Sequence, residues 1–290
     1  MNQDPLFVIV VPTYNRVELL MRSLISIENQ EYKNWECVVI NDGCTDDTDR
    51  QMVDYIKDKK RFSYIKQENK GVNAARNAGI DLIERSIVDC YYVFIDDDDY
   101  LSEDCLIKAQ AMIKENSDYK WFGYNCINIE NKKKVSRIRR YGENNYIKGL
   151  MFGNDWRGDI TSFIHSSILA DFRFCKEIKN GEEWYFWAQL SINNNVLILD
   201  EPGSFKDYLP AGLTKSGFNR DKAIQVQLLK LKILSPIVGE RKMIHQIVTL
   251  AKNYYQSGKK EEARIFLKKA FKLNPLYLRQ YTHWIKHFFS

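Results

Sequence analysis

Residues 90 to 101 read CYYVFIDDDDYL, an apolar run that passes directly into four consecutive aspartates. The run from Cys90 to Ile95 has the composition of a buried strand, yet the sequence puts no basic residue beside the carboxylates that follow it. Like charges this close repel one another, and some of them would stay protonated unless a cation lay among them. The stretch therefore predicts a buried strand that ends at a cation-binding site.

Strands and helices alternate through the first part of the chain. Apolar runs predict strands at residues 6–11, 35–42, 62–66 and 90–95, and helical spacing predicts helices at 17–30, 45–57 and 72–85. This alternation is typical of an α/β fold, with a mostly parallel sheet flanked by helices. Such sheets bind ligands beyond the carboxyl ends of their strands, so we expect Asn41-Asp42-Gly43 and Asp96 to Asp99 to form one site.

The aspartates favour a metal that binds phosphate. Carboxylate oxygens are hard ligands that suit Mg²⁺ or Mn²⁺. The sequence has no GxxxxGK[ST] motif and no GxGxxG motif after its first strand, so a nucleotide would need the metal to hold its phosphates. The alternative is a solvated acidic turn that caps the next helix, with Ser102 at the N-cap, although a cap needs one acid and not four.

Charge is unevenly distributed along the 290 residues. Residues 241–290 contain eleven Lys and Arg and two acids, a net charge of +9, whereas the rest of the chain carries −4. This asymmetry predicts an anionic partner for the tail. No run approaches the ~20 apolar residues of a membrane span, the N-terminal stretch has no basic signal-peptide region, and the six cysteines form no CxxC pair. We expect a cytoplasmic protein with reduced thiols.

The pattern changes to short strands and loops from about residue 120. GEEWYFWAQL (181–190) predicts an aromatic-rich helix, VLILDEPGSF (196–205) a strand and a turn, and the chain beyond Ser216 only helices. The basic segment KKKVSRIRR (132–140) is interpreted either as a solvated hairpin or as a clamp for a phosphate-bearing acceptor.

Five motifs together resemble the family 2 glycosyltransferases of the GT-A fold, over about residues 6 to 215. They are PTYNR (12–16), NDGCTDDT (41–48), NKGVNAARNAG (69–79), FIDDDDYL (94–101) and GEEWYFW (181–187), and they occur in the order and spacing of the family. The resemblance implies metal-dependent transfer of a sugar from a nucleotide-diphosphate donor, usually a UDP-sugar, with inversion at the sugar carbon. It also implies a role in building a bacterial surface polysaccharide or lipid-linked glycan.

The resemblance also implies roles for single residues. Asp98 and Asp99 would hold the Mn²⁺ or Mg²⁺ ion, with Asp98 as the direct ligand, and either Glu183 or its neighbour Glu182 would be the general base. The residues implied to bind the nucleotide sugar are Pro12, Thr13, Tyr14, Arg16, Asp42, Asn73, Arg76, Asp96 and Asp97, among which Asp42 would read the uracil.

Two further residues are candidates for binding the acceptor. His165 lies in an apolar stretch, where a histidine is more often structural, and Trp184 is either a core residue or a ring that stacks on an acceptor sugar.

Three different functional classes compete with a glycosyltransferase. Two carboxylates could serve a glycoside hydrolase, but that chemistry gives no reason to cluster acids at one strand end. A catalytically idle nucleotide-sugar sensor would not need the acids at 96–99 and 182–183, which are all present. A scaffold protein built on helical repeats would need more repeats than the one that the sequence contains.

The C-terminal region is expected to form a separate helical part at residues 216–290, after a catalytic domain at 1–215. Within that domain we expect residues 1–125 to bind the nucleotide sugar and residues 126–215 the acceptor. Residues 250–275 resemble one tetratricopeptide unit, which must bury its apolar face against another surface. The basic tail with Trp284, Phe288 and Phe289 predicts contact with the inner face of the cytoplasmic membrane, and docking on the catalytic domain is the alternative.

Overall fold

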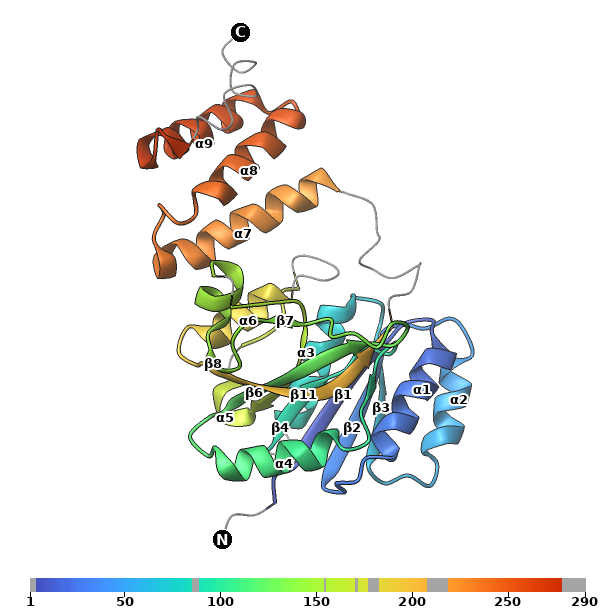
Figure 1. Cartoon of the computed structure of the whole chain (residues 1–290). Coiled ribbons are helices and arrows are strands. Elements are labelled where there is room, and N and C mark those ends of the chain that lie inside the picture. The colour runs from blue at the N-terminus through green and yellow to red at the C-terminus, as the bar shows by residue number, and fades with distance from the viewer. Residues whose placement is uncertain are drawn as a thin grey trace. The chain divides into compact units, whose positions relative to one another are not determined.

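The computed structural model describes residues 4–84, 89–153, 155–169, 172–176, 183–207 and 219–277. The chain divides into two compact units, Met1–Leu213 and Thr214–Ser290. Unit 1 contains a mixed sheet with helices on both faces, and the described part of unit 2 is helical (Figure 1).

Nine strands form the main sheet in the described part of unit 1. In spatial order they are β3 (Phe62–Lys66), β2 (Trp35–Asn41), β1 (Phe7–Thr13), β4 (Tyr91–Phe94), β10 (Ile160–His165), β6 (Trp121–Asn128), β11 (Val196–Lys206) and β5 (Tyr100–Leu101), with β8 (Gly142–Asn144) also paired to β11. The first four strands in this order are parallel, as the sequence predicts. β10 is antiparallel to both β4 and β6, and β11 is parallel to β6.

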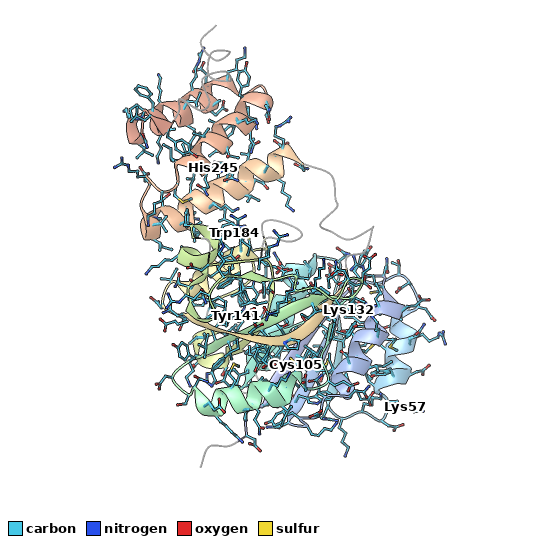
Figure 2. All side chains as sticks on the ribbon, viewed as in Figure 1. Lys57, Cys105, Lys132, Tyr141, Trp184 and His245 are labelled. Atoms are coloured by element: carbon cyan, nitrogen blue, oxygen red, sulfur yellow. The ribbon has the colours of Figure 1, made fainter. Side chains whose placement is uncertain are left out.

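Alternating residues of β1 pack against different helices. Phe7, Ile9 and Val11 belong to a core shared with α1 (Val17–Glu28), α2 (Thr48–Ile56) and α4 (Cys105–Glu115), which starts at the buried Cys105 labelled in Figure 2. Val10 faces α3 (Val72–Glu84), where a Cβ atom on Gly79 would lie 2.5 Å from the Val10 side chain. The glycine therefore lets α3 lie close against the sheet, and this closeness positions the residues of α3 over the carboxyl ends of the strands.

The helix predicted at residues 45–57 begins later, at Thr48. Residues 43–47 instead form a loop that side chains hold in place. The Asn41 side chain accepts a hydrogen bond from the Cys44 N–H at 2.6 Å, and the Asn15 side chain accepts one from the Thr45 N–H at 2.7 Å. Side-chain acceptors of this kind compete with helix formation, which explains the shorter helix.

The acidic run does not cap the helix that follows it. That helix, α4, begins at Cys105 with Asp104 at its N-cap position, and the Ser102 hydroxyl donates to the Pro202 carbonyl at 3.1 Å. The interpretation of the four aspartates as a helix cap with Ser102 at the N-cap is therefore wrong.

The second half of unit 1 contains short elements. The described part includes the π-helical segment η1 (Tyr146–Met151), α5 (Ser166–Leu169), α6 (Trp184–Ser191) and a two-stranded ribbon of β7 (Arg137–Ile138) and β9 (Trp156–Arg157). The basic segment is thus not a hairpin closed on itself, since its second half pairs with β9. The stretch predicted as strand and turn is the single strand β11, in which irregular register around Pro202 accommodates the missing N–H.

Unit 2 contains the helices α7 (Arg220–Val238), α8 (Ile244–Gln256) and α9 (Lys260–Leu273). Ala251 of α8 packs with Ala263 and Leu267 of α9, and Gly258 adopts a positive φ of 78° in the short connection between the two helices. The helical prediction is confirmed for the described residues, while the likeness to a tetratricopeptide unit remains a prediction. Within these residues, no helix combines the length and apolarity that crossing a bilayer requires.

Candidate active site

The strand directions of unit 1 bring five separate segments to one edge of the sheet. β1, β2 and β4 are parallel, so Thr13, Asn41 and the aspartates after Phe94 lie at the same carboxyl edge. Two successive antiparallel pairings reverse the direction at β10 and restore it at β6, and β11 follows β6. The carboxyl end of β11 at Lys206 and the start of β10 at Ile160 therefore also lie at this edge.

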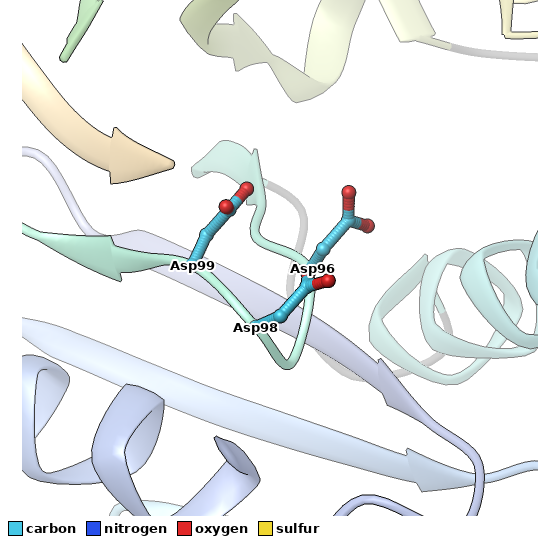
Figure 3. Close-up of side chains that lie close together, drawn as sticks. All are labelled: Asp96, Asp98 and Asp99. Carbon is cyan, nitrogen blue, oxygen red and sulfur yellow. The ribbon is translucent and has the colours of Figure 1, made fainter. Parts of the chain in front are cut away.

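Three of the four aspartates form a compact oxygen-rich cluster. Carboxylate oxygens of Asp96, Asp98 and Asp99 lie within 4.8 Å of one another, and the side chains project from one tight turn (Figure 3). Three hard oxygen donors at this spacing fit a divalent cation such as Mg²⁺ or Mn²⁺. We call Asp96, Asp98 and Asp99 the acidic cluster.

Asp97 lies outside the acidic cluster and binds the loop after β1. Its carboxylate accepts hydrogen bonds from the Thr13 hydroxyl at 2.8 Å and from Arg16 at 3.2 Å, and the residue is buried. These contacts fix the loop that contains Tyr14, whose side chain is 47% exposed and free to contact a ligand.

The counter-charges of the aspartates come from distant parts of the sequence. Arg76 on α3 donates to Asp96, and Arg16 donates to Asp98 at 3.0 Å. The Lys206 ammonium lies 2.6 Å from Asp99. Both arginines were predicted from the sequence, but Lys206 was not, because its only local signal is a cation at the end of a predicted strand.

Burial and charge shift the pKa values of these groups in opposite directions. Burial alone would raise the pKa of Asp96, but the positive charges of Arg76 and Lys206 hold it below its usual value. Burial raises the pKa of Asp97 to about 7, and burial together with the charge of Asp96 raises the pKa of Asp98. Burial would lower the pKa of Lys206, but Asp99 and Asp96 hold it well above its ordinary range, so Lys206 is a cation.

Asp42 holds a loop at the end of β2. Its carboxylate accepts hydrogen bonds from the backbone N–H groups of Lys70 at 2.9 Å and Gly71 at 2.8 Å, and from the Gln67 side chain at 2.7 Å. Gly43 permits this approach, because a Cβ atom there would lie 2.8 Å from the Asn69 nitrogen. Asp42 therefore holds the loop that contains Gln67, Lys70 and Gly71 at the end of β2.

A pocket of about 310 Å³ opens beside the acidic cluster, and residues from both halves of unit 1 line it. Its lining residues are Arg76, Phe94, Asp96, Trp121, Tyr146, Leu150, Trp156, Gly158, Asp159, Ile160, Ser162, Phe174, Glu183, Trp184, Trp187 and Lys206. The aromatic residues of this lining form what we call the aromatic wall: Phe94, Trp121, Tyr146, Trp156, Phe174, Trp184 and Trp187. Acids and bases together with an aromatic wall suit a sugar ring joined to an anion. Of the aromatic wall, the sequence predicted a site role only for Trp184, and it predicted none for Asp159, because these residues come from separate strands, helices and loops.

Glu183 is linked to the acidic cluster through Arg76. The guanidinium of Arg76 donates to Glu183 at 2.7 Å and to Asp96 at 2.5 Å, and its side chain is only 5% exposed. The Glu183 side chain is 36% exposed and lines the pocket, as does Trp184, which is labelled in Figure 2. Glu182, the other candidate base, lies outside the described residues.

His165 lies far from the acidic cluster in the sheet. It pairs with Tyr91 at the start of β4, whereas the aspartates follow the end of that strand. Its ring contacts Asp89 at 2.8 Å and Ser167 at 2.7 Å. The structure therefore does not bring His165 to the site that contains the other candidates.

Asn73 and Pro12 are buried parts of the scaffold around the site. The Asn73 amide donates to the Cys175 carbonyl at 2.9 Å, and its buried side-chain oxygen has no hydrogen-bond partner within the described chain. Pro12 lies in β1, one residue before Thr13. Both residues support the loops of the site.

Solved structures share this fold. The crystal structure of S. aureus TarS 1–349 in complex with UDP-GlcNAc aligns with a TM-score of 0.64 at 19% identity, over 87% of this chain and 73% of that chain. The crystal structure of S. aureus TarS gives a TM-score of 0.65 at 19% identity, over 86% of this chain and 43% of that chain. At this identity the likeness establishes the fold alone, which is the GT-A fold.

Curated relatives include two glucosyltransferases. The GalNAc(5)-diNAcBac-PP-undecaprenol beta-1,3-glucosyltransferase of Campylobacter jejuni is 31% identical over 64% of this chain and 60% of its own length. The UDP-Glc:alpha-D-GlcNAc-diphosphoundecaprenol beta-1,3-glucosyltransferase WfgD of Escherichia coli is 25% identical over 67% of this chain and 72% of its own length.

An uncharacterized glycosyltransferase of Rickettsia conorii is 27% identical over 67% of this chain, but the match spans only 31% of that protein. The chain thus covers between 31% and 72% of the length of these relatives. The sequence pattern of glycosyl transferase family 2 matches residues 8–178, which is more than half of the chain and includes the acidic cluster, Asp42 and Arg76. The chain therefore belongs to glycosyl transferase family 2.

Proposed function

We propose that this protein transfers a sugar from a UDP-sugar to a hydroxyl group of a lipid-linked glycan, with inversion at the sugar carbon and with a divalent metal bound at the acidic cluster. One observation carries the proposal. A single pocket contains the cluster residue Asp96 and the exposed carboxylate of Glu183, and the Arg76 guanidinium binds both. A metal site and a base beside one cavity are what metal-assisted glycosyl transfer needs.

Relatives support the choice of donor and acceptor. The TarS crystal contains UDP-GlcNAc, and the E. coli relative is named for UDP-Glc. Both named glucosyltransferases act on undecaprenol diphosphate carrying sugars. A nucleotide diphosphate also agrees with the hard-oxygen cluster, because no glycine-rich phosphate loop is present in the sequence.

Different residues of the site have different roles in the proposed reaction. Asp96, Asp98 and Asp99 would hold the metal, which would supply positive charge to stabilise the diphosphate leaving group. Glu183 accepts the proton of the acceptor hydroxyl as that oxygen attacks the sugar carbon from the face opposite the diphosphate. Arg76 orients the Glu183 carboxylate, and a single displacement of this kind inverts the configuration without a covalent enzyme intermediate.

The two parts of unit 1 would contribute different groups to the pocket. Residues 1–125 supply Arg76 and Asp96 on the donor side, and residues 126–215 supply most of the aromatic wall with Glu183 on the acceptor side. Trp184 is suited to stack on an acceptor sugar because it lines the pocket directly after Glu183.

Transfer to a defined acceptor tests this proposal. The protein is incubated with a UDP-sugar, Mn²⁺ and a short-chain lipid diphosphate that carries one sugar, and the product is analysed by mass spectrometry and by NMR of the new glycosidic bond. The expected product is one sugar heavier and has the anomeric configuration opposite to that of the donor. A product that keeps the donor configuration would contradict the inverting mechanism, and a released free sugar with no transfer would contradict the acceptor class.

The basic C-terminal region is proposed to contact an anionic membrane surface. In its described part, Ile265, Phe271 and Leu276 are 63%, 58% and 64% exposed, and the exposed Lys268 and Lys272 lie among them. Basic residues near an anionic bilayer contribute about 1 kcal/mol each. Flotation with anionic vesicles is expected for the full chain, with release in high salt and loss on removal of residues 276–290. Equal flotation of the shortened chain would place the contact elsewhere.

A further inference from the structure

Lys206 is an internal cation in contact with the acidic cluster. Its ammonium lies 2.6 Å from Asp99, 4.0 Å from Asp96 and 4.0 Å from Asp159, and the side chain is 20% exposed. Its backbone is fixed at the end of β11, where it pairs with Asn128 and its carbonyl accepts a hydrogen bond from the Ile129 N–H at 3.0 Å. The ammonium can therefore change partners by side-chain rotation alone.

Arg76 and Arg16, the other two cations that contact the acidic cluster, differ from Lys206 because each also binds an acid outside the cluster. Arg76 binds Asp96 but also Glu183, and Arg16 binds Asp98 but also Asp97. Each arginine thus keeps a close acid outside the cluster when a metal takes its cluster partner. The closest partner of Lys206 is Asp99 itself.

We propose that Lys206 is a positioning residue that competes with the divalent cation for Asp99, so that metal binding displaces its ammonium from the cluster. This inference rests on the proposed function, because it assumes that the acidic cluster holds a metal. Two cations cannot both lie within contact distance of one carboxylate oxygen without strong repulsion when the carboxylate is as buried as Asp99, whose side chain is 4% exposed. The ammonium therefore weakens metal binding in the absence of donor.

The displaced ammonium needs a new anionic partner. Asp159 is 4.0 Å away and 60% exposed, so it is a weak substitute. A nucleotide diphosphate in the pocket, which Lys206 lines, supplies a stronger one. Metal and UDP are therefore expected to bind cooperatively, and the coupling between them depends on Lys206.

Binding of Mn²⁺ alone tests the competition directly. Free Mn²⁺ is measured by electron paramagnetic resonance during titration of wild type, Lys206→Met, Lys206→Arg and the control Lys108→Met. Lys108 also bridges two acids, Asp104 at 2.7 Å and Glu201 at 2.9 Å, but lies outside the site. Lys206→Met is expected to bind Mn²⁺ at least about tenfold more tightly than wild type, because one positive charge has left the cluster. The Mn²⁺ affinities of Lys206→Arg and of the control Lys108→Met are expected to stay near that of wild type.

Adding UDP gives a second readout. In wild type, UDP is expected to raise the Mn²⁺ affinity by a larger factor than in Lys206→Met, where the coupling through the ammonium is absent. If circular dichroism shows that Lys206→Met does not fold, chemical acetylation of the wild-type protein is the test. Acetylation of Lys206, mapped by mass spectrometry, is expected to increase when Mn²⁺ is added, because the ammonium has then left Asp99.

The outcomes separate this inference from the proposed function. Mn²⁺ affinity of Lys206→Met equal to or weaker than that of wild type overturns the competition, as does acetylation of Lys206 that Mn²⁺ leaves unchanged. In either case, the proposed metal site still stands if wild type binds Mn²⁺ and Asp98→Ala does not. If no form of the protein binds Mn²⁺, the metal assignment and this inference are both wrong.

Discussion

The guanidinium of Arg76 lies 2.7 Å from the carboxylate of Glu183, which is 107 residues further along the chain. The same guanidinium binds Asp96, so one buried side chain joins the acidic cluster to the proposed base. This bridge fixes Glu183 at the wall of the pocket next to the donor side. It also supplies both carboxylates with their closest counter-charge.

Replacing Arg76 with Met is expected to lower the free energy of unfolding by about 3 kcal/mol, because it removes a buried cation that both Asp96 and Glu183 bind. Lys at this position keeps the charge but loses the fork that binds both acids, so Arg76→Lys should be destabilised less. Urea denaturation at neutral pH measures both. A loss below about 1 kcal/mol in Arg76→Met would show that the bridge contributes little.

Asp98→Ala is expected to weaken Mn²⁺-dependent binding of UDP at least ~100-fold, because it removes one of three ligands of the proposed metal. The fold should persist, since Arg16 retains Asp97 as a partner. Isothermal titration with and without Mn²⁺ measures the effect. Asp47→Ala is the control, because Asp47 binds Arg50 and Gln51 of its own helical turn. Unchanged Mn²⁺-dependent affinity in Asp98→Ala would remove Asp98 from the metal site.

Glu183→Gln is expected to cut turnover by at least ~10²-fold while UDP affinity stays near wild type, because the amide cannot accept the proton of the acceptor. The amide oxygen can still accept from Arg76, so the pocket should keep its shape. Single-turnover kinetics and UDP titration separate the two effects. If Glu182→Gln instead shows the reduced turnover with unchanged UDP affinity, and Glu183→Gln turns over at the wild-type rate, the base is Glu182.

Asp42→Asn is expected to weaken UDP binding about tenfold or more. The amide nitrogen would face the N–H donors of Lys70, Gly71 or Gln67, and a lost hydrogen bond to a charged acceptor costs about 1.5–3 kcal/mol. Calorimetric titration with UDP measures the effect. Asp46→Asn is a matched control, because Asp46 accepts from the Thr48 N–H at the start of α2 and Asn retains that acceptor. If Asp42→Asn binds UDP as tightly as wild type, the loop that Asp42 holds has no role in nucleotide binding.

His165→Gln is expected to leave transfer kinetics unchanged and to alter the pH dependence of stability. The His165 Nδ1 accepts the Ser167 N–H at 3.1 Å, so the neutral ring carries its proton on Nε2 and donates to Asp89. Burial, aided by Lys120 and opposed by Asp89, lowers the pKa of His165. The unfolded chain, with a histidine pKa of about 6.5, then binds the proton more strongly than the folded chain, so stability contributed by the neutral ring is lost as pH falls below about 6.5.

Thermal denaturation from pH 7.5 to pH 5 checks this, with His245→Gln, in unit 2, as the control (Figure 2). The melting temperature of wild type should fall more steeply below pH 6.5 than that of His165→Gln. A large loss of transfer activity in His165→Gln would restore His165 as a candidate acceptor ligand.

The parallel half of the sheet was predictable because its information is local. Apolar runs at β1, β2 and β4 identify buried strands, and the polar residues that follow each strand mark the edge where ligands bind. The acidic cluster follows from the same local signal, since three aspartates on one turn cannot lie far apart.

The counter-charges were harder to predict because they depend on long-range pairing. Lys206 reaches Asp99 for two reasons: β10 is inserted antiparallel between β4 and β6, which turns the carboxyl end of β11 to the site, and β11 pairs with β5 in a register that sets Phe205 opposite Tyr100. Nothing local in the sequence specifies that insertion. The same reversal carries His165 to the opposite edge of the sheet, which explains why an apolar stretch with one histidine gave no reliable signal.

Release of UDP from a panel of UDP-sugars tests the central claim most directly. The protein is incubated with each donor and a lipid diphosphate acceptor, with Mn²⁺ or with excess chelator, and UDP is quantified by chromatography. We expect UDP release from at least one UDP-sugar. This release should depend on both Mn²⁺ and acceptor and should be lost in Asp98→Ala. Release that chelator or Asp98→Ala leaves undiminished would contradict the metal site at Asp96, Asp98 and Asp99, and no release from any UDP-sugar would contradict the proposed donor.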